Sequence, residues 1–452
     1  MSVLPLLLMM MPVVILATAP TVDRFNQWFA SLDSSGVGLT ATTSPLYGGL
    51  GVVPTRSGHK GETILSVPLS AVMHRTLLAS LPVAALQSVA SSAQCDDADL
   101  IAVALLMAKK RADEALAQWT VWVDALPSEF LAPFTFADND ALVSLFDAAM
   151  QDNVRHQRQQ ADTHFRTVQA LVKSAVAVSR AEWYWALGMV NSRAWSLRGT
   201  RYFVPMADMF NMAPTEAQLS REHSFEMRGD DFAAGHKVVG DRVHVLADRD
   251  FVAGEELFET YGDNADAIYL QYHGFVPDVN PSACVDLRID LPVLLNPPPT
   301  SAKVQILQRL KVPRFRSYCV RDKRYMPLDS TQTFLVFPAW LVDLISVDRL
   351  SEEQAAKLLA DGRFAWRSPA LAESSGKLVQ TLIHRWAVAA RAAYSVTLAQ
   401  DDAALASTTL SPAERLVRQY TRNQKRILDQ WIIPDPPEVA AFKRRKGLKT
   451  EL

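Results

Sequence analysis

The sequence predicts an α+β protein of two domains, a β-rich module with a helical insert followed by a mainly α-helical domain. The chain has 452 residues, which is more than one hydrophobic core usually covers, and 49% apolar with 21% charged residues is ordinary for a globular protein. Short apolar runs bounded by glycine lie on both sides of an alanine- and leucine-rich stretch at about 70–190. After a proline-marked link at 296–299, the pattern is helical again from about Val347.

The elements follow from local patterns in chain order. Apolar residues at helical spacing predict a helix at 24–32, and further helical stretches at 99–122, 139–153 and 155–178. β-branched or alternating runs with nearby turn residues predict the following strands: 52–53, 64–68, 201–203, 242–246 and 257–260. The clearest helix start is Ser411-Pro412-Ala413-Glu414, with Ser411 as N-cap, Pro412 at the first helical position and Glu414 reaching back. From it, Leu416, Tyr420, Ile427 and Trp431 form one apolar stripe.

These patterns divide the chain into four segments. We expect them at the following positions: a targeting leader at 1–20, the β-rich domain at 21–290 with its insert at about 70–190, the helical domain at 291–435, and a basic tail at 436–452.

The first residues leave two compartments open. The apolar run from Val3 to Ala17 ends in an A-x-A pattern typical of a signal peptide and is too short to span a bilayer, so no membrane span is expected. No Lys or Arg precedes it, and the alternative is an N-terminal extension without a targeting role. The ending, Lys449 to Leu452, differs by one residue from the KDEL retrieval signal. The compartment is the cytoplasm or nucleus if the leader does not function, and the endoplasmic reticulum or another organelle if it does.

Charge and cysteine usage exclude several classes. A formal net charge of -2 provides no global field that attracts nucleic acid, so no specific nucleic-acid partner is expected. Cys95, Cys284 and Cys319 are too far apart for CxxC pairs, and their odd number argues against a disulfide framework, although one bridge is compatible with a secreted chain. His156 and His164 lack HExxH spacing, and we expect no metal. The chain also has no G-x-S-x-G elbow, P-loop or dinucleotide-binding fingerprint.

The most informative motif is a pair of segments, VPMADMFNMAP at 204–214 and AGEELFETYGDNADAIYLQYHGFV at 253–276. The pair resembles the signature of the SET-domain methyltransferases. Within them it is similar to the branch that includes the Rubisco large-subunit lysine methyltransferase and the actin-histidine methyltransferase. In that branch an Asp-x-x-Asn comes first and a Tyr-Gly follows a Gly-Glu turn, and here these residues are Asp208, Asn211, Tyr261 and Gly262.

The resemblance implies a SET domain with a pseudoknot, followed by a Rubisco methyltransferase-like helical domain that binds the substrate protein. It implies methyl transfer from S-adenosyl-L-methionine to a lysine, or a histidine, of a non-histone protein. Such a transfer needs alignment of two reactants and oxygen dipoles around the methyl group. A rigid tyrosine hydroxyl that stays neutral near pH 7 suits this task, and Tyr261 is the catalytic candidate.

The family's other roles carry over to matching positions. A glycine-rich turn that gives backbone groups to the cofactor matches Gly48, Gly49 and Leu50, and an arginine that pairs with the cofactor's carboxylate matches Arg193. The remaining cofactor-binding candidates implied by the resemblance are Asp208, Asn211, Met212 and Phe275, and those for the substrate channel are Tyr272 and His273.

Three positions depart from the family pattern. Met212 stands where the family usually has His, His273 stands where lysine-methylating members have a second active-site tyrosine, and Asp266 replaces a common Asn. The actin-histidine enzyme also lacks a tyrosine at the position of His273. These changes leave a second interpretation open, a catalytically inactive member that uses the same groove as a protein-binding module. In either case we expect a monomer that binds a protein.

Overall fold

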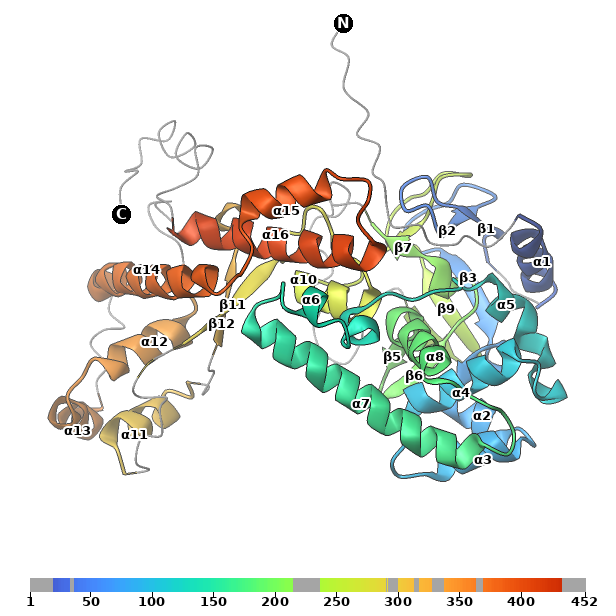
Figure 1. The fold of residues 1–452 in the computed structure, drawn as a ribbon, viewed down its shortest axis with the longest axis horizontal. Coiled ribbons are helices and arrows are strands. Elements are labelled where there is room, and N and C mark those ends of the chain that lie inside the picture. Colours follow the sequence, from blue (N-terminus) through green and yellow to red (C-terminus); the bar gives the residue numbers. More distant parts are fainter. Residues whose placement is uncertain are drawn as a thin grey trace, which may run out of the picture.

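The computed structural model confirms the α+β class and places the two halves of the chain side by side, with helix α16 (Pro412–Ile432) reaching across both (Figure 1). It describes residues 19–32, 36–213, 236–289, 291, 300–312, 317–326, 337–362 and 369–432, with the backbone alone at 369–378. The expected leader up to residue 18, the link at 296–299 and the basic tail lie outside the described residues.

The described residues of the N-terminal half form four small sheets. Their strands are β1 (Leu39–Thr43) with β2 (Leu50–Pro54), β3 (Thr63–Pro68) with β9 (Arg242–Leu246) and β8 (His236–Val239), β4 (Met73–His74) with β6 (Thr200–Phe203) and β5 (Trp195–Leu197), and β7 (Asn211–Met212) with β10 (Phe258–Glu259). The predicted strands at 52–53, 64–68, 201–203 and 242–246 are confirmed. The strand predicted at 257–260 is shorter, because only Phe258 and Glu259 pair with β7.

Helices fill the chain between β4 and β5, as the alanine- and leucine-rich pattern predicts. They are α2 (Arg75–Ser80), α3 (Ala84–Ser91), α4 (Asp97–Lys109), α5 (Thr120–Ala125), α6 (Asp140–Val143), α7 (Ala148–Val172) and α8 (Arg180–Arg193), with 3-10 turns at Glu114–Trp119 and Pro133–Phe136.

All three of the helical stretches expected in the insert have different bounds. The stretch at 139–153 is divided between α6, which ends at Val143, and the start of α7, with Asp147 as its N-cap. The stretch at 99–122 is broken, because α4 ends at Lys109 and Arg111 has a φ of 51°. In contrast, 155–178 does not form a separate helix, because α7 is one continuous helix. It keeps a buried face at Met150, Val154, Ala161 and Phe165.

The C-terminal half is built around two antiparallel strands, β11 (Cys284–Arg288) and β12 (Ser317–Arg321). Its helices are α11 (Ala302–Arg309), α12 (Ala339–Asp348), α13 (Glu352–Asp361), α14 (Pro369–Ala392), α15 (Leu398–Leu405) and α16. Helical structure therefore begins well before Val347. A disulfide joins Cys284 to Cys319 across the strand pair, so the one bridge that the cysteine count left open is present.

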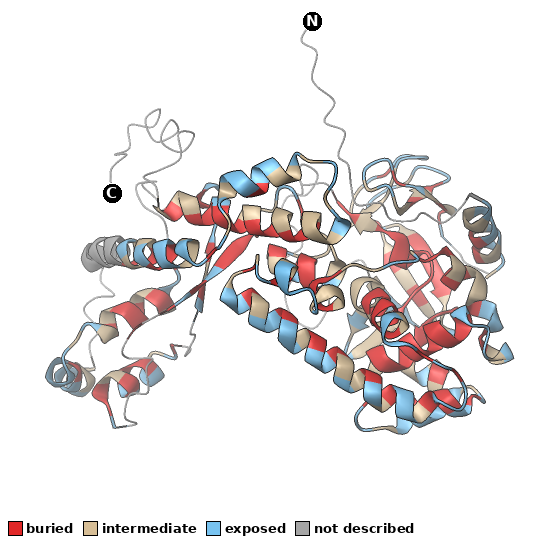
Figure 2. Ribbon diagram, viewed as in Figure 1, coloured by how far each residue is buried: buried red, intermediate tan, exposed pale blue. Residues whose placement is uncertain are grey.

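Two hydrophobic cores stabilise the halves, and a third cluster joins them (Figure 2). The core of the C-terminal half includes Val285 and Leu287, so β11 packs with the C-terminal helices although it lies before the expected boundary at residue 290. The joining cluster combines Phe146 and Met150 of the insert, Leu270, and Tyr420 of α16. Because buried apolar area stabilises in proportion to its size, this cluster holds the two halves together.

The first and last described helices, α1 and α16, agree with the helices that the local sequence predicts. Helix α1 (Ala19–Ala30) buries Phe25 and Phe29 as the 24–32 pattern predicts, although it starts earlier. At the start of α16, Ser411 Oγ accepts a hydrogen bond of 3.2 Å from the Glu414 backbone N–H, which confirms the N-cap. The Glu414 carboxylate accepts from Arg418 instead of reaching back. The predicted apolar stripe on α16 is buried.

Candidate active site

Three segments that are far apart in the sequence meet at the centre of the N-terminal half. Strand β7 pairs in parallel with β10, so that Asn211 lies opposite Phe258 and Met212 opposite Glu259. The preceding residue, Leu257, donates its backbone N–H to Val52 of β2 at 2.8 Å. We call this meeting of β2, β7 and β10 the crossing. It brings together the 204–214 motif, the 253–276 motif and the glycine-rich turn.

Tyr261 follows β10 and points back to the first motif. Its hydroxyl donates a hydrogen bond of 2.8 Å to the carbonyl oxygen of Phe210, the residue before Asn211. Burial, together with the nearby Glu259 carboxylate, raises the pKa of Tyr261 above its ordinary value. The phenol is therefore neutral near pH 7, and its oxygen keeps lone pairs that can accept a hydrogen bond.

His273 lies against Tyr261, with ring centroids 4.9 Å apart. Burial lowers the pKa of His273 to about 4, and the Arg193 charge acts in the same direction. Its Nδ1 is buried and has no hydrogen-bond partner among the described residues. The side chain is therefore a neutral imidazole that packs on the Tyr261 ring and has one nitrogen without a partner among the described residues.

Tyr272 and Phe275, which flank His273 and Gly274 in the sequence, differ in position. The Phe275 ring packs edge-on against Tyr261 at 6.2 Å, so Phe275 belongs to the aromatic cluster. Tyr272 is 40% exposed and, in the described part of the chain, makes no ring contact with that cluster. Between them, Gly274 has a φ of 75° and a side chain there would collide with the Leu131 carbonyl, so only glycine fits.

Arg193, at the end of α8, lies beside Asp208. Its Nη1 donates a hydrogen bond of 2.6 Å to the Asp208 carbonyl oxygen and lies 3.8 Å from Asp208 Oδ2. The Asp208 carboxyl accepts from the indole of buried Trp122 through Oδ1 at 3.2 Å, while Oδ2 has no hydrogen-bond partner among the described residues. Burial raises the pKa of Asp208 to about 7 even though Arg193 opposes the shift.

Asn211 is held from two sides. Its Nδ2 donates to the Leu50 carbonyl at 2.9 Å and to Glu256 Oε1 at 2.7 Å. Both amide hydrogens are therefore used. Its neighbour Met212 presents its carbonyl oxygen to the Tyr47 hydroxyl at 2.6 Å, and burial raises the pKa of Tyr47 to about 12.

The glycine-rich turn lies over this crossing. Gly48 has a φ of 68°, and a Cβ added at Gly48 or Gly49 would meet no atom of the described residues within 4 Å. Gly51 is different, because a Cβ there would collide with the Glu256 carboxylate. Each of the cofactor candidates of the turn and of β7 is therefore near the crossing, with Leu50 already bonded to Asn211.

Sequence reasoning missed Tyr47, Trp122 and Glu256. Glu256 looks like an ordinary exposed residue of a Gly-Glu turn, and only its place two residues before β10 hints at burial. Its Oε2 accepts a hydrogen bond of 2.7 Å from Ser44 Oγ. The contacts of Tyr47 and Trp122 join residues separated by 165 and 86 positions, and no local pattern indicates them.

Asp266, one of the departures from the family pattern, bonds to the C-terminal half. Its buried carboxylate accepts from the side chains of Asn280 at 2.8 Å and Asn423 of α16 at 3.2 Å. Burial raises its pKa. Through Asn423, Asp266 joins the middle of the second motif to the C-terminal half.

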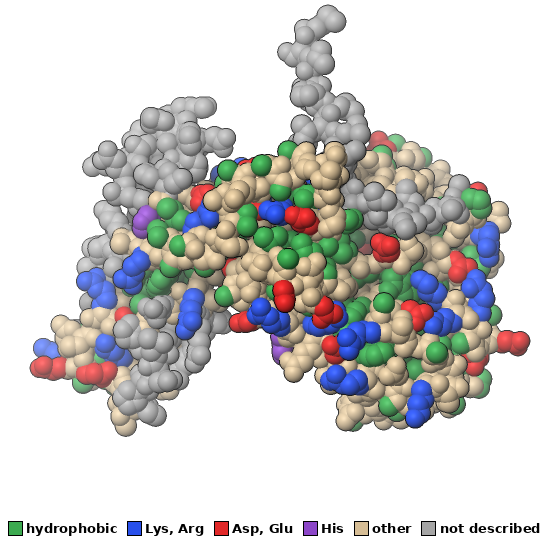
Figure 3. Space-filling model, in the orientation of Figure 1, with side chains coloured by type: hydrophobic (Ala, Val, Ile, Leu, Met, Phe, Trp, Pro, Cys, Tyr) green, Lys and Arg blue, Asp and Glu red, His purple; other side chains and the backbone are tan. Residues whose placement is uncertain are grey.

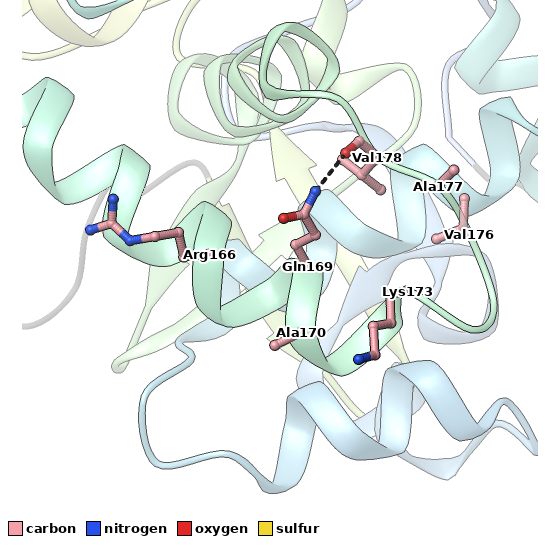
Figure 4. Close-up of a pocket in the computed structure, with 7 residues that line it drawn as sticks. All are labelled: Arg166, Gln169, Ala170, Lys173, Val176, Ala177 and Val178. Carbon is pink, nitrogen blue, oxygen red and sulfur yellow. Dashed lines mark hydrogen bonds between the residues drawn. The ribbon is translucent and has the colours of Figure 1, made fainter.

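Other features of the described chain lie outside this site. A pocket at the end of α7 is lined by none of the candidate residues, and its Gln169 side chain donates to the Val178 carbonyl (Figure 4). Figure 3 shows positive and negative side chains interspersed over the insert. In the described residues no helix is long and apolar enough to cross a membrane, and no three His, Cys, Asp or Glu side chains gather as a metal site.

Comparison with known proteins identifies the fold. No family model and no curated protein sequence matches the chain. Among solved structures, the SET domain of LSMT bound to methyllysine and AdoHcy aligns with a TM-score of 0.67 and 17% identity, over 95% of this chain and 92% of that one. Rubisco LSMT bound to AdoMet aligns with a TM-score of 0.65 and 16% identity, over 95% and 93%. The chain therefore has the SET fold in the arrangement of Rubisco LSMT, with a helical C-terminal region.

Proposed function

We propose that this chain is an S-adenosyl-L-methionine-dependent protein N-methyltransferase that acts on a lysine side chain of a non-histone protein, with histidine as the alternative acceptor. The observation that carries the proposal is the Tyr261 hydroxyl, which is held by the Phe210 carbonyl next to Asn211. In the SET fold this places a neutral, oriented oxygen at the crossing of the two motifs. The similar Rubisco LSMT structures bind AdoMet, AdoHcy, sinefungin and methylated lysine.

The residues present fit this cofactor. Arg193 is 25% exposed and uses only Nη1 for its described contacts, so its guanidinium can pair with a carboxylate. Among the described residues, the Asn211 side-chain carbonyl oxygen has no partner, and no atom lies within 4 Å of a Cβ added at Gly48 or Gly49. We assign cofactor contact to these groups, to Asp208 and Met212, and to Phe275.

The bound cofactor would supply an electrophilic methyl group on a sulfonium. Tyr261 Oη accepts a hydrogen bond from the attacking nitrogen and so directs the nitrogen lone pair. The neutral imidazole of His273 adds no positive charge next to this nitrogen, and the Tyr261 and His273 rings are half-buried against each other. The acceptor nitrogen would lose its proton to solvent before transfer. The cofactor, held by groups that include Arg193 and Asn211, would supply the methyl group and leave as the neutral thioether S-adenosylhomocysteine.

The test is calorimetry of the purified chain with S-adenosylmethionine and S-adenosylhomocysteine, followed by labelled-methyl transfer to proteins of a cell extract. We expect micromolar binding that weakens at least about tenfold in Arg193→Ala, because a charge-assisted contact is lost. Arg198→Ala, which removes an exposed arginine outside the site, is the matched control. Absence of binding by the folded chain would contradict the proposal and support the inactive protein-binding module.

We also propose an oxidising compartment, because the Cys284–Cys319 disulfide is of the kind that persists in secreted and endoplasmic-reticulum proteins. Alkylation of the denatured chain, after the thiols of the cells have been quenched with acid, measures this. One modified cysteine, the buried Cys95, is expected, and three would mean that the protein resides in the reducing cytoplasm or nucleus. We propose a monomer that binds its substrate protein, which light scattering of the purified chain would test.

A further inference from the structure

One carboxylate binds together the segments on which the proposed cofactor site depends. Glu256 accepts hydrogen bonds from Ser44 Oγ and from Asn211 Nδ2, both at 2.7 Å, and its Oε1 lies directly over Gly51. Ser44 in turn bonds the glycine turn, because its backbone N–H donates to the Gly49 carbonyl at 2.8 Å. Glu256 therefore contacts the turn, strand β2 and strand β7 at once.

This arrangement decides which way the Asn211 amide faces. Leu50 O and Glu256 Oε1 are both acceptors, so Nδ2 must face them and the carbonyl oxygen Oδ1 must face the other way. A hydrogen bond to a carboxylate is charge-assisted and about twice as strong as a neutral one. It also polarises the amide, which makes Oδ1 a better acceptor. Two parts of the cofactor carry N–H donors that could bind Asn211 Oδ1, the cationic ammonium and the neutral adenine amine. The Glu256 carboxylate nearby favours the cationic ammonium.

We propose that Glu256 is a positioning residue that locks the Asn211 amide with Oδ1 toward the ligand, and that it thereby sets the affinity for the amino-acid part of the cofactor. This inference rests on the proposed function. We assign Glu256 no contact with the cofactor; its carboxylate oxygens accept from the protein, Oε1 from Asn211 and Oε2 from Ser44.

The experiment compares two ligands by calorimetry, S-adenosylhomocysteine and 5′-methylthioadenosine, which lacks the amino-acid part. We expect Glu256→Ala to weaken S-adenosylhomocysteine about tenfold, the size of one hydrogen bond to a charged group. The affinity for 5′-methylthioadenosine should change less than about twofold, as expected of an independent part of the site. Glu255→Ala, the exposed neighbour in the same turn, is the matched control and should change neither.

Two further variants separate positioning from general support of the fold. Glu256→Gln keeps an oxygen that accepts from Asn211 and should restore most of the affinity. Asn211→Ala should lose as much as Glu256→Ala, and the double variant should lose no more, because both act through one contact. Gly51→Ala adds a methyl group that would displace the Glu256 carboxylate and lie 3.1 Å from Asn211 Nδ2, so it should disturb the same contact and reproduce the loss if Glu256→Ala does not fold.

The outcomes distinguish the inference from the proposed function. If the wild-type chain does not bind S-adenosylhomocysteine, the proposed function fails. If it binds and Glu256→Ala binds equally well, or weakens both ligands equally, only the positioning role is overturned. Additive losses in the double variant would also overturn it.

Discussion

The hydroxyl of Tyr261 donates a hydrogen bond of 2.8 Å to the Phe210 carbonyl, across 51 residues of sequence. The phenol oxygen is thereby fixed next to Asn211. Under the proposed function, Tyr261→Phe removes the oxygen that directs the attacking nitrogen, and methyl transfer should fall about 100-fold, as when a preorganised dipole is deleted. Binding of S-adenosylhomocysteine, by calorimetry, should change less than about threefold, because the lost contact serves the transition state.

The control for this substitution is Tyr325→Phe, which removes a hydroxyl in the C-terminal half and should leave transfer unchanged. Equal transfer by wild type and Tyr261→Phe would remove Tyr261 from the mechanism. A parallel loss of cofactor binding would instead mean that the hydroxyl mainly supports the fold around Phe210.

Asp208 should make the protein less stable as the pH rises. Its pKa is raised by burial from 3.8 to about 7, so the folded state binds the proton more tightly than the unfolded state. The stabilisation is fully present below pH 3.8 and is lost as the pH rises through about 7. Asp208→Asn cannot ionise, and between pH 5 and pH 8 its stability relative to wild type should improve by about 3 kcal/mol.

Urea unfolding of both proteins at pH 5 and pH 8 measures this difference. If the two proteins differ in free energy of unfolding by the same amount at both pH values, Asp208 ionises normally. The physical reason would then be that Arg193 moves closer to Asp208 Oδ2 and stabilises its charge.

Asn423 should couple the two halves of the molecule through Asp266. Its side chain donates both to Asp266 Oδ2 and to the Pro277 carbonyl, each at 3.2 Å. Asn423→Ala leaves these acceptors buried with fewer donors and should lower the free energy of unfolding by about 1–3 kcal/mol. Asn423→Asp should cost more at pH 8 than at pH 5, because two carboxylates would then face each other. An unfolding curve that shows no change in either variant would contradict the coupling.

The Cys284–Cys319 disulfide should stabilise the C-terminal half. It closes a loop with a sequence separation of 35 residues, and its reduction should lower the free energy of unfolding by about 3–4 kcal/mol in the loop-entropy account. Thermal unfolding with and without dithiothreitol measures the loss. Cys319→Ser should show the same loss of stability without dithiothreitol, and adding dithiothreitol should not lower its stability further. A further loss would mean that the reductant acts on another bond.

Elements with strong local patterns were predictable, and those that depend on distant partners were less so. The strands at 64–68 and 242–246 are rich in β-branched residues or alternate between apolar and polar residues. The Ser411 cap and the apolar stripe of α16 depend only on residues within that one helix and its start. The break after Lys109 and the continuity of α7 were not predicted, because both depend on which face finds a packing partner. The onset of helical structure after residue 300 was placed too late for the same reason.

The sequence by itself determined the fold class, through periodicity and glycine placement, and it indicated the two motifs that meet at the crossing. Only the tertiary structure decided that Glu256 holds Asn211, that Tyr47 bonds Met212 and that Asp266 faces Asn423. The physical reason is that periodicity reports which face of an element is buried, whereas a hydrogen bond between distant side chains depends on the path of the whole chain. From the sequence, Glu256 in its turn is expected to be exposed to solvent, and only the fold places the Ser44 and Asn211 donors beside it.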